Sequence, residues 1–236
     1  ARWNHPEQGP TGPDVFIPVA EESGLIVGLT DLVLKRACDQ LRQWQLIDES
    51  FADLRMQVNL SGRDVAQAGL TGRISQALLG AGLQAQHLTL ELTENILMER
   101  LETALPMLEE LRGLGVRLSV DDFGTGYSSL AHLSTLPIDS LKVDRSFVRN
   151  LSAGSKEAMV VRGIVQLGQS LGKDVVAEGI ETASQFDQLR GMGCHPLVPV
   201  GEREELPPDE ADPGADRDPV PELLEDERRE ARAVGP

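Results

Sequence analysis

The stretch VRLSVDDFGTGYSSL, residues 116–130, joins a strand pattern to two acids and a glycine-rich loop. Its first five residues alternate between apolar and polar side chains, which predicts a half-buried strand. The strand runs into Asp121 and Asp122, and Gly124 and Gly126 then provide a backbone that bends freely or approaches a ligand closely. An isolated pair of acids is also typical of a helix cap beside a turn. The meaning of this pair therefore depends on the rest of the chain.

The composition predicts one large folded domain and excludes several classes of protein. The chain has 236 residues, of which 40% are hydrophobic, enough for a sizeable core. A net charge of -16 and an aromatic content of 3% argue against a nucleic-acid polymer as partner. The two cysteines, Cys38 and Cys194, have no metal-ligand spacing and predict a cytoplasmic localisation without disulfides. The sequence shows no signal peptide and no membrane-length apolar run, so we expect membrane association only through sequence upstream of Ala1.

Strands and helices are expected to alternate along most of the chain. The expected strands cover 56–60, 87–92, 116–120, 140–143 and 174–177, with helical patterns between them. Such alternation predicts parallel strands joined by crossover helices, in an α/β fold of the (β/α)8 TIM-like barrel type that is incomplete in this chain. A doubly wound open sheet is the alternative, but its dinucleotide-binding fingerprint is absent from the sequence.

Local signals give further expectations for the segments around these strands. Residues 1–18 hold four prolines and are expected to form a loop. Thr30 is a candidate N-cap for the helix that follows it. Two longer helices are expected over 64–79 and 95–112, the second with a kink at Pro106.

Polar residues stand at or just after the end of each expected strand, and a barrel would bring them to one face. They are Asn59, Glu91, Asp121 with its neighbour Asp122, Lys142 and Glu178. Carboxylates in one pocket repel one another unless cations neutralise them, and oxygen ligands favour Mg²⁺ or Mn²⁺. Two such ions can activate a water and stabilise the leaving oxygen of a phosphoester, and Lys142 would stabilise charge on the phosphate or orient the water. The residues therefore predict metal-assisted phosphoester hydrolysis, although each one alone is also typical of a solvated strand end or a helix cap.

Two other motif interpretations are weaker. Residues Asp122, Phe123 and Gly124 spell the DFG motif of protein kinases. A kinase also needs a catalytic loop and a glycine-rich loop upstream of that motif, and the sequence contains neither. The four histidines are not spaced as metal ligands, and we expect them to be surface or packing residues.

Six segments within residues 1–194 can be compared with known families: FIPVAEESGLI at 16–26, VNLS at 58–61, LELTEN at 90–95, VDDFGTGYSSL at 120–130, LKVDRSFV at 141–148 and AEGIET at 177–182. In this order and spacing they resemble the EAL-domain family, the cyclic-di-GMP phosphodiesterases of bacteria. The resemblance implies a modified TIM barrel with two Mg²⁺ or Mn²⁺ ions that hydrolyses cyclic di-GMP to linear pGpG. It also implies cyclic di-GMP as a partner and a homodimer formed through helices near the loop at 121–126.

The same resemblance implies a role for each site residue. The residues similar to metal ligands are Asn59, Glu91, Asp121 (which bridges both ions), Asp122 and Glu178. Lys142 is similar to the residue that assists the attacking water, so the implied catalytic set is Lys142, Glu178 and Asp121. Arg2 and Asp144 are similar to substrate-binding residues, and Glu94 is similar to the glutamate that holds the glycine-rich loop in place.

The resemblance stops near both ends of the chain. The glutamate of the Glu-Ala-Leu motif would lie before Ala1, and the first strands of the barrel are expected to be missing with it. After Cys194, Val198 stands where the family has a glutamine at the metal site. We expect a partial phosphodiesterase domain over 1–194 and a disordered acidic, proline-rich tail over 195–236, with 13 acids and 5 bases after residue 200. These departures predict reduced or absent activity, and the alternative function is a catalytically impaired module that binds cyclic di-GMP or another protein.

Overall fold

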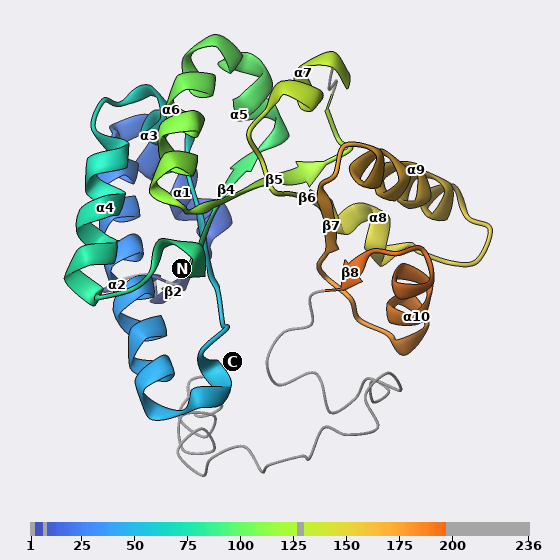
Figure 1. Cartoon of the computed structure of the whole chain (residues 1–236), viewed down its shortest axis with the longest axis horizontal. Coiled ribbons are helices and arrows are strands. Elements are labelled where there is room, and N and C mark those ends of the chain that lie inside the picture. Colours follow the sequence, from blue (N-terminus) through green and yellow to red (C-terminus); the bar gives the residue numbers. More distant parts are fainter. Residues whose placement is uncertain (1–2, 7–8, 127–129, 197–236) are drawn as a thin grey trace.

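A six-stranded parallel sheet forms the centre of the computed structural model, which describes residues 3–6, 9–126 and 130–196 (Figure 1). Its strands, in spatial order, are β3 Met56–Asn59, β4 Leu88–Thr93, β5 Arg117–Phe123, β6 Ser140–Val143, β7 Asp174–Ala177 and β8 His195–Pro196. Each strand lies beside the next one in sequence, as in a (β/α) barrel, whereas the order reverses in a doubly wound sheet. The predicted α/β fold with a parallel sheet is therefore confirmed. Among the described residues, β3 and β8 are the outer strands and each pairs on one side only.

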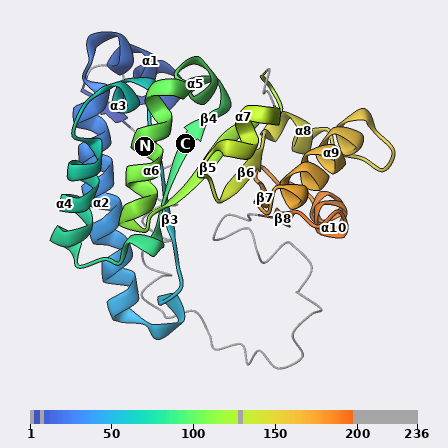
Figure 2. The ribbon, with the colours of Figure 1, turned by 45° about the horizontal axis from the view of Figure 1, so that its top comes forward.

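Helices flank the sheet at both ends. They are α1 Pro13–Ser23, α2 Ile26–Ile47, α3 Gly62–Ala66, α4 Leu70–Ala81, α5 Glu94–Glu99, α6 Leu101–Leu114, α7 Leu130–Thr135, α8 Arg145–Arg149, α9 Lys156–Ser170 and α10 Ala183–Gly191, with short 3₁₀ turns at Glu49–Phe51 and Ala85–His87. The helices α2, α4 and α6 gather beside β3 and β4, and α8, α9 and α10 gather beside β7 and β8 (Figure 1 and Figure 2). Within the part of the chain that the structure describes, none of these helices is both long and apolar enough to cross a membrane.

The core of the molecule lies between the sheet and these helices. Every second residue of β4, Leu88, Leu90 and Leu92, is fully buried at 0% exposure. Leu108 and Leu111 of α6 are equally buried and belong to the same apolar cluster. Strands of this kind, buried on both faces, are typical of parallel sheets covered by helices. The carboxyl ends of the strands are consequently held on a rigid frame.

The loop predicted for residues 1–18 is wrong for the part of that segment that is described. Trp3–His5 and Gly9–Thr11 form the antiparallel strands β1 and β2, and α1 begins at Pro13. The ring of Trp3 contacts the ring of Phe16 edge to face, with 6.1 Å between centroids. Pro13 is compatible with the start of a helix, because the backbone N–H of the first helical residue has no partner within the helix and its absence costs nothing there.

Three helix boundaries also differ from the sequence prediction. Thr30 is not an N-cap, because it lies inside α2 and its hydroxyl donates to the carboxylate of Asp64 at 3.0 Å. The helix expected over 64–79 is divided into α3 and α4 by Gly69, which has a φ of 87°. The helix expected over 95–112 breaks at Arg100, whereas α6 continues through Pro106.

Candidate active site

Lys142 of β6 lies among three carboxylates at the carboxyl ends of the strands. Its Nζ atom is 3.0 Å from Oε2 of Glu91, 3.2 Å from Oδ1 of Asp121 and 3.1 Å from Oε2 of Glu178. Glu91 comes from β4 and Asp121 from β5, while Glu178 directly follows β7. The structure thus brings together four residues that are 30, 21 and 36 positions apart in the chain. When all four groups are ionised, the three carboxylates exceed the charge of the single ammonium.

Burial makes these charges strongly interdependent. The side chains of Lys142 and Glu91 are each 3% exposed, and that of Asp121 is 14% exposed. Burial raises the pKa of Glu91, although the adjacent Lys142 opposes the shift. Burial alone would lower the pKa of Lys142, but the carboxylates of Glu91, Asp121 and Glu178 outweigh it and raise the pKa above its usual value. Lys142 therefore stays protonated at neutral pH and acts as the counterion of the group.

Asp122 follows Asp121 at a bulge, where the register between β5 and β6 shifts between Val120 and Phe123. Its φ of 55° lies in the left-handed region, which residues with side chains rarely adopt. Its backbone N–H donates to Oδ1 of Asp121 at 3.0 Å. Partial desolvation, followed by repulsion from Asp121 and Asp144, raises the pKa of Asp122. Asp122 therefore belongs to the same electrostatic cluster.

Asp144 links this cluster to α8. Its Oδ1 atom accepts hydrogen bonds from the N–H of Ser146, at 2.9 Å, and from the Ser146 hydroxyl. Although partial burial opposes the shift, these bonds and one from Asp122 lower the pKa of Asp144. Asp144 thus stays ionised next to Asp122 and also caps the first turn of α8.

The glycine-rich loop after β5 is attached to α5 through Glu94. The backbone N–H of Gly124 donates to Oε2 of Glu94 at 2.9 Å. Gly126 is so close to α5 that a Cβ atom there would lie 2.7 Å from Oε1 of Glu94 and 3.0 Å from Oδ1 of Asn95. A side chain at Gly126 would therefore displace Glu94 from this position.

Two other predicted residues are not part of the cluster around Lys142. Asn59 is exposed at the end of β3, and its Cα atom pairs in register with that of Glu91. Paired residues of parallel strands project to the same face, so Asn59 shares the face of Glu91. Arg2 lies outside the described residues.

The residues present fit a hard divalent cation. Mg²⁺ and Mn²⁺ prefer oxygen ligands. The residues expected to bind the metal can all supply a side-chain oxygen: Asn59, Glu91, Asp121, Asp122 and Glu178. The Oε1 atom of Glu91 is buried and has no hydrogen-bond partner among the residues that the structure describes, so a cation would satisfy it. Among the described residues, however, no group of three or more acidic, histidine or cysteine side chains is arranged so that it could hold a metal ion. The ammonium group of Lys142 lies among the carboxylates instead.

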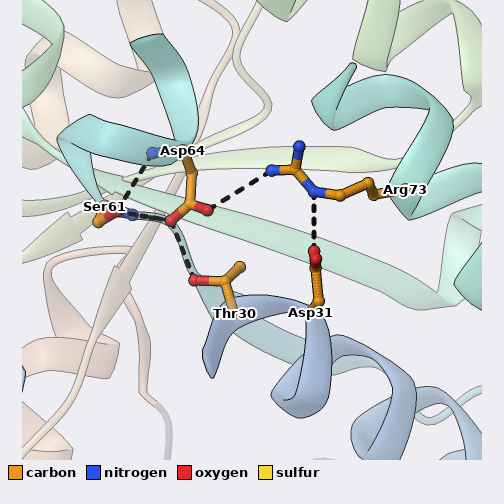
Figure 3. Close-up of polar contacts among 5 residues, drawn as sticks. All are labelled: Thr30, Asp31, Ser61, Asp64 and Arg73. Atoms are coloured by element: carbon orange, nitrogen blue, oxygen red, sulfur yellow. Dashed lines mark hydrogen bonds and ion pairs between the residues drawn. The ribbon is translucent and has the colours of Figure 1, made fainter. Parts of the chain in front are cut away.

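A buried polar cluster beneath the end of β3 was missed by the sequence analysis (Figure 3). The Oδ2 atom of Asp64, a side chain with 0% exposure, accepts from the hydroxyl of Thr30 at 3.0 Å and from the N–H and hydroxyl of Ser61 at 2.9 and 2.6 Å. Arg73 lies between Asp64, at 3.7 Å, and Asp31, at 2.7 Å. The cluster ties α2, α3 and α4 to the chain just after Asn59. The spacing Ser61-x-x-Asp64 is the capping-box pattern, which could have revealed it.

Comparison with known proteins agrees with this geometry. The model of the family described as EAL domain matches residues 1–197. In Pseudomonas aeruginosa, the bifunctional diguanylate cyclase/cyclic di-GMP phosphodiesterase MucR is 45% identical over 196 residues, covering 83% of this chain and 28% of MucR. The cyclic di-GMP phosphodiesterase NbdA of the same organism is 47% identical over 193 residues, covering 82% of this chain and 24% of NbdA. The chain thus spans about a quarter of the length of these curated relatives.

Solved structures extend the similarity to three dimensions. The structure of the MucR phosphodiesterase in complex with cyclic di-GMP superposes with a TM-score of 0.77 at 45% identity, covering 82% of this chain and 78% of that one. The strand order, the acids at the strand ends and the family match over 1–197 agree with one another. This chain belongs to the EAL-domain family.

Proposed function

We propose that this chain is the catalytic module of a cyclic-di-GMP phosphodiesterase, which hydrolyses one phosphodiester bond of cyclic di-GMP to give linear pGpG. The observation that carries the proposal is the convergence of Glu91, Asp121 and Glu178 on the buried ammonium of Lys142. Acids are costly to bury together, and their arrangement at the strand ends of such a fold is typical of an active site. The names of MucR and NbdA support the choice of substrate.

The charge and exposure of each site residue suggest its role in the proposed hydrolysis. Lys142 is the cation that lies within 3.2 Å of Glu91, Asp121 and Glu178, so we assign to it electrostatic stabilisation of the phosphate and orientation of water. Glu178, whose side chain is 41% exposed, is the most open of the three carboxylates and is assigned to face the substrate. Asp144 and Arg2 are assigned to substrate binding, and Glu94 to holding the loop around Gly124.

The proposal includes a metal requirement. Asn59, Glu91, Asp121, Asp122 and Glu178 would hold Mg²⁺ or Mn²⁺. When bound, such ions lower the pKa of a coordinated water and stabilise charge on a phosphoryl oxygen. We place this function in residues 1–194 and assign no catalytic role to residues 195–236, of which His195 and Pro196 form β8.

Product analysis tests the proposal. The 236-residue chain is incubated with cyclic di-GMP and Mg²⁺ or Mn²⁺, and pGpG is separated by chromatography. We expect product from the wild type and from Glu109→Gln, an exposed glutamate of α6 used as a matched control. Glu91→Gln should lower the rate of pGpG formation at least about a hundredfold, because it removes a buried negative charge from the site. Equal rates for Glu91→Gln and the control would refute the assignment of the site.

A second candidate is a module that binds cyclic di-GMP without hydrolysing it. It is favoured by the Lys142 ammonium among the carboxylates and by the absence, over the described ranges, of a ready cation cage. Calorimetry that shows binding by a cooperatively melting chain, together with no pGpG, would support this candidate instead.

A further inference from the structure

The side chain of Gln185 connects two loops at the carboxyl ends of the strands. It lies in the first turn of α10 and is only 6% exposed. Its Oε1 atom accepts from the backbone N–H groups of Glu181, at 2.8 Å, and Thr182, at 3.0 Å. Its Nε2 atom donates to the carbonyl oxygens of Val148, at 3.1 Å, and Arg149, at 3.4 Å. Because a backbone N–H only donates and a carbonyl only accepts, these partners fix the orientation of the amide.

The two segments that Gln185 joins both carry residues of the candidate site. Glu181 and Thr182 end the loop that starts at Glu178, and Val148 and Arg149 end α8, which starts directly after Asp144. Hydrogen bonds at both ends of one buried amide restrict the movement of one segment relative to the other. The hydrogen bonds of the Gln185 amide go to backbone atoms of these two segments, and the ion-pair partners of Lys142 are Glu91, Asp121 and Glu178. The influence of Gln185 on these acids is therefore indirect.

The space around Gly179 shows that these segments also approach each other closely. Gly179 has a φ of 71°, and a Cβ atom at that position would lie 3.3 Å from Cβ of Arg145. The loop after Glu178 therefore passes close to the start of α8, while Gln185 binds the end of that helix. The loop thus passes close to α8 before Ile180, which is itself 3% exposed, and is hydrogen-bonded to Gln185 after it.

Helix capping alone does not account for these contacts. Gln185 forms a capping box with Thr182, whose hydroxyl accepts from the N–H of Gln185 at 3.2 Å. Glutamate serves equally well at this position of a capping box. Only an amide, however, also donates hydrogen bonds to the carbonyl oxygens of Val148 and Arg149, because a carboxylate has no donor.

From these contacts we propose that Gln185 is a positioning residue, which holds the Glu178 loop against α8 and so keeps Glu178 aligned with Lys142 and Asp144. The inference rests on the proposed phosphodiesterase function for its catalytic consequence. The four hydrogen bonds by which Gln185 joins the Glu178 loop to α8, called the clamp below, do not depend on that function. Displacement of a reacting group by about 1 Å can reduce a rate by about a hundredfold. Loss of the clamp is therefore expected to lower kcat more than it raises KM.

Two variants separate the clamp from the helix cap. Gln185→Glu keeps acceptors for Glu181 and Thr182 but removes the donors to α8, whereas Thr182→Val removes the cap hydroxyl and keeps the amide. In the 236-residue chain with Mn²⁺ and cyclic di-GMP, we expect Gln185→Glu to lower kcat at least about tenfold and Thr182→Val to stay within about twofold. Comparable losses of kcat in both variants would overturn the proposal, because the cap would then explain the effect.

Hydrogen–deuterium exchange gives a readout that is independent of catalysis. We expect the backbone amides of the segment 178–182 to exchange at least about tenfold faster in Gln185→Glu than in the wild type. In Thr182→Val we expect these amides to exchange at the wild-type rate. If the wild type produces no pGpG but this exchange pattern is found, the proposed function fails and the clamp stands. If exchange of 178–182 is unchanged in Gln185→Glu, the clamp is refuted whatever the activity.

Discussion

Replacing Lys142 by methionine should destabilise the folded chain strongly in the absence of metal. Methionine is of similar length but carries no charge, so Glu91, at 3% exposure, and Asp121, at 14%, lose a cation within 3.2 Å. Removing one partner of a buried ion pair costs about 3–5 kcal/mol. For a domain of this size, such a loss corresponds to a fall of about 6–20 °C in Tm.

The matched control is Lys35→Met on α2. Lys35 forms a shorter ion pair, 2.6 Å from Asp39, but its side chain is 71% exposed. Exposed pairs within a helix contribute at most about 0.5 kcal/mol, so this variant should melt close to the wild type. The double variant Lys142→Met/Glu91→Gln should recover part of the loss, because it removes the buried charge that the single change leaves uncompensated. The measurement is thermal and urea unfolding in EDTA.

The loss should also depend on pH. Burial raises the pKa of Glu91 in the folded chain, and Lys142 opposes that rise. Without Lys142 the folded-state pKa rises further, so the folded form binds the Glu91 proton more tightly than the unfolded form does. Stability then falls as the pH rises from the unfolded-state pKa through the folded-state pKa. The difference in free energy of unfolding between Lys142→Met and the wild type should therefore become smaller as the pH is lowered toward about 5. A variant as stable as Lys35→Met, or a gap that widens on acidification, would refute the reasoning.

Two further predictions concern groups away from Lys142. Asp64→Ala should cost about 3–5 kcal/mol in urea unfolding, because three donors and Arg73 lose a fully buried carboxylate, whereas Thr30→Val should cost only about 1 kcal/mol; equal costs would contradict this account of the cluster. Burial raises the pKa of Cys38 to about 11 and that of Cys194 to about 12. Iodoacetamide at about pH 8 should therefore modify both thiols only after unfolding, and rapid labelling of the folded chain, followed by mass spectrometry, would count against their burial.

Much of the sheet could be predicted because its signals are local. The strands expected over 140–143 and 174–177 have these same bounds in the structure, where short apolar runs are followed by polar residues. The order of the strands also followed from their alternation with helices. The acids at the strand ends could then be placed together without knowledge of any side-chain conformation.

What could not be predicted depends on contacts between distant segments. Thr30 has the chemistry of an N-cap, but its hydroxyl donates to Asp64, 34 residues further along the chain. Pro106 has the chemistry of a helix kink, but the break falls at Arg100. Gln185 looks like an ordinary capping residue until α8 supplies acceptors for its amide. For Thr30 and Gln185 the local signal was real, and contacts with distant segments decided which groups these side chains bind.

The pair Asp121 and Asp122 shows the same limit at the site itself. Consecutive residues of a regular strand point to opposite faces of the sheet, so simple alternation would separate the two carboxylates. The bulge between Val120 and Phe123 and the positive φ of Asp122 interrupt that alternation. As a result, Asp121 contacts Lys142 while Asp122 interacts with Asp144. A left-handed conformation of this kind costs about 1–3 kcal/mol and persists only where the surroundings impose it. The strained residue therefore accounts for how one strand could contribute two carboxylates to the proposed site.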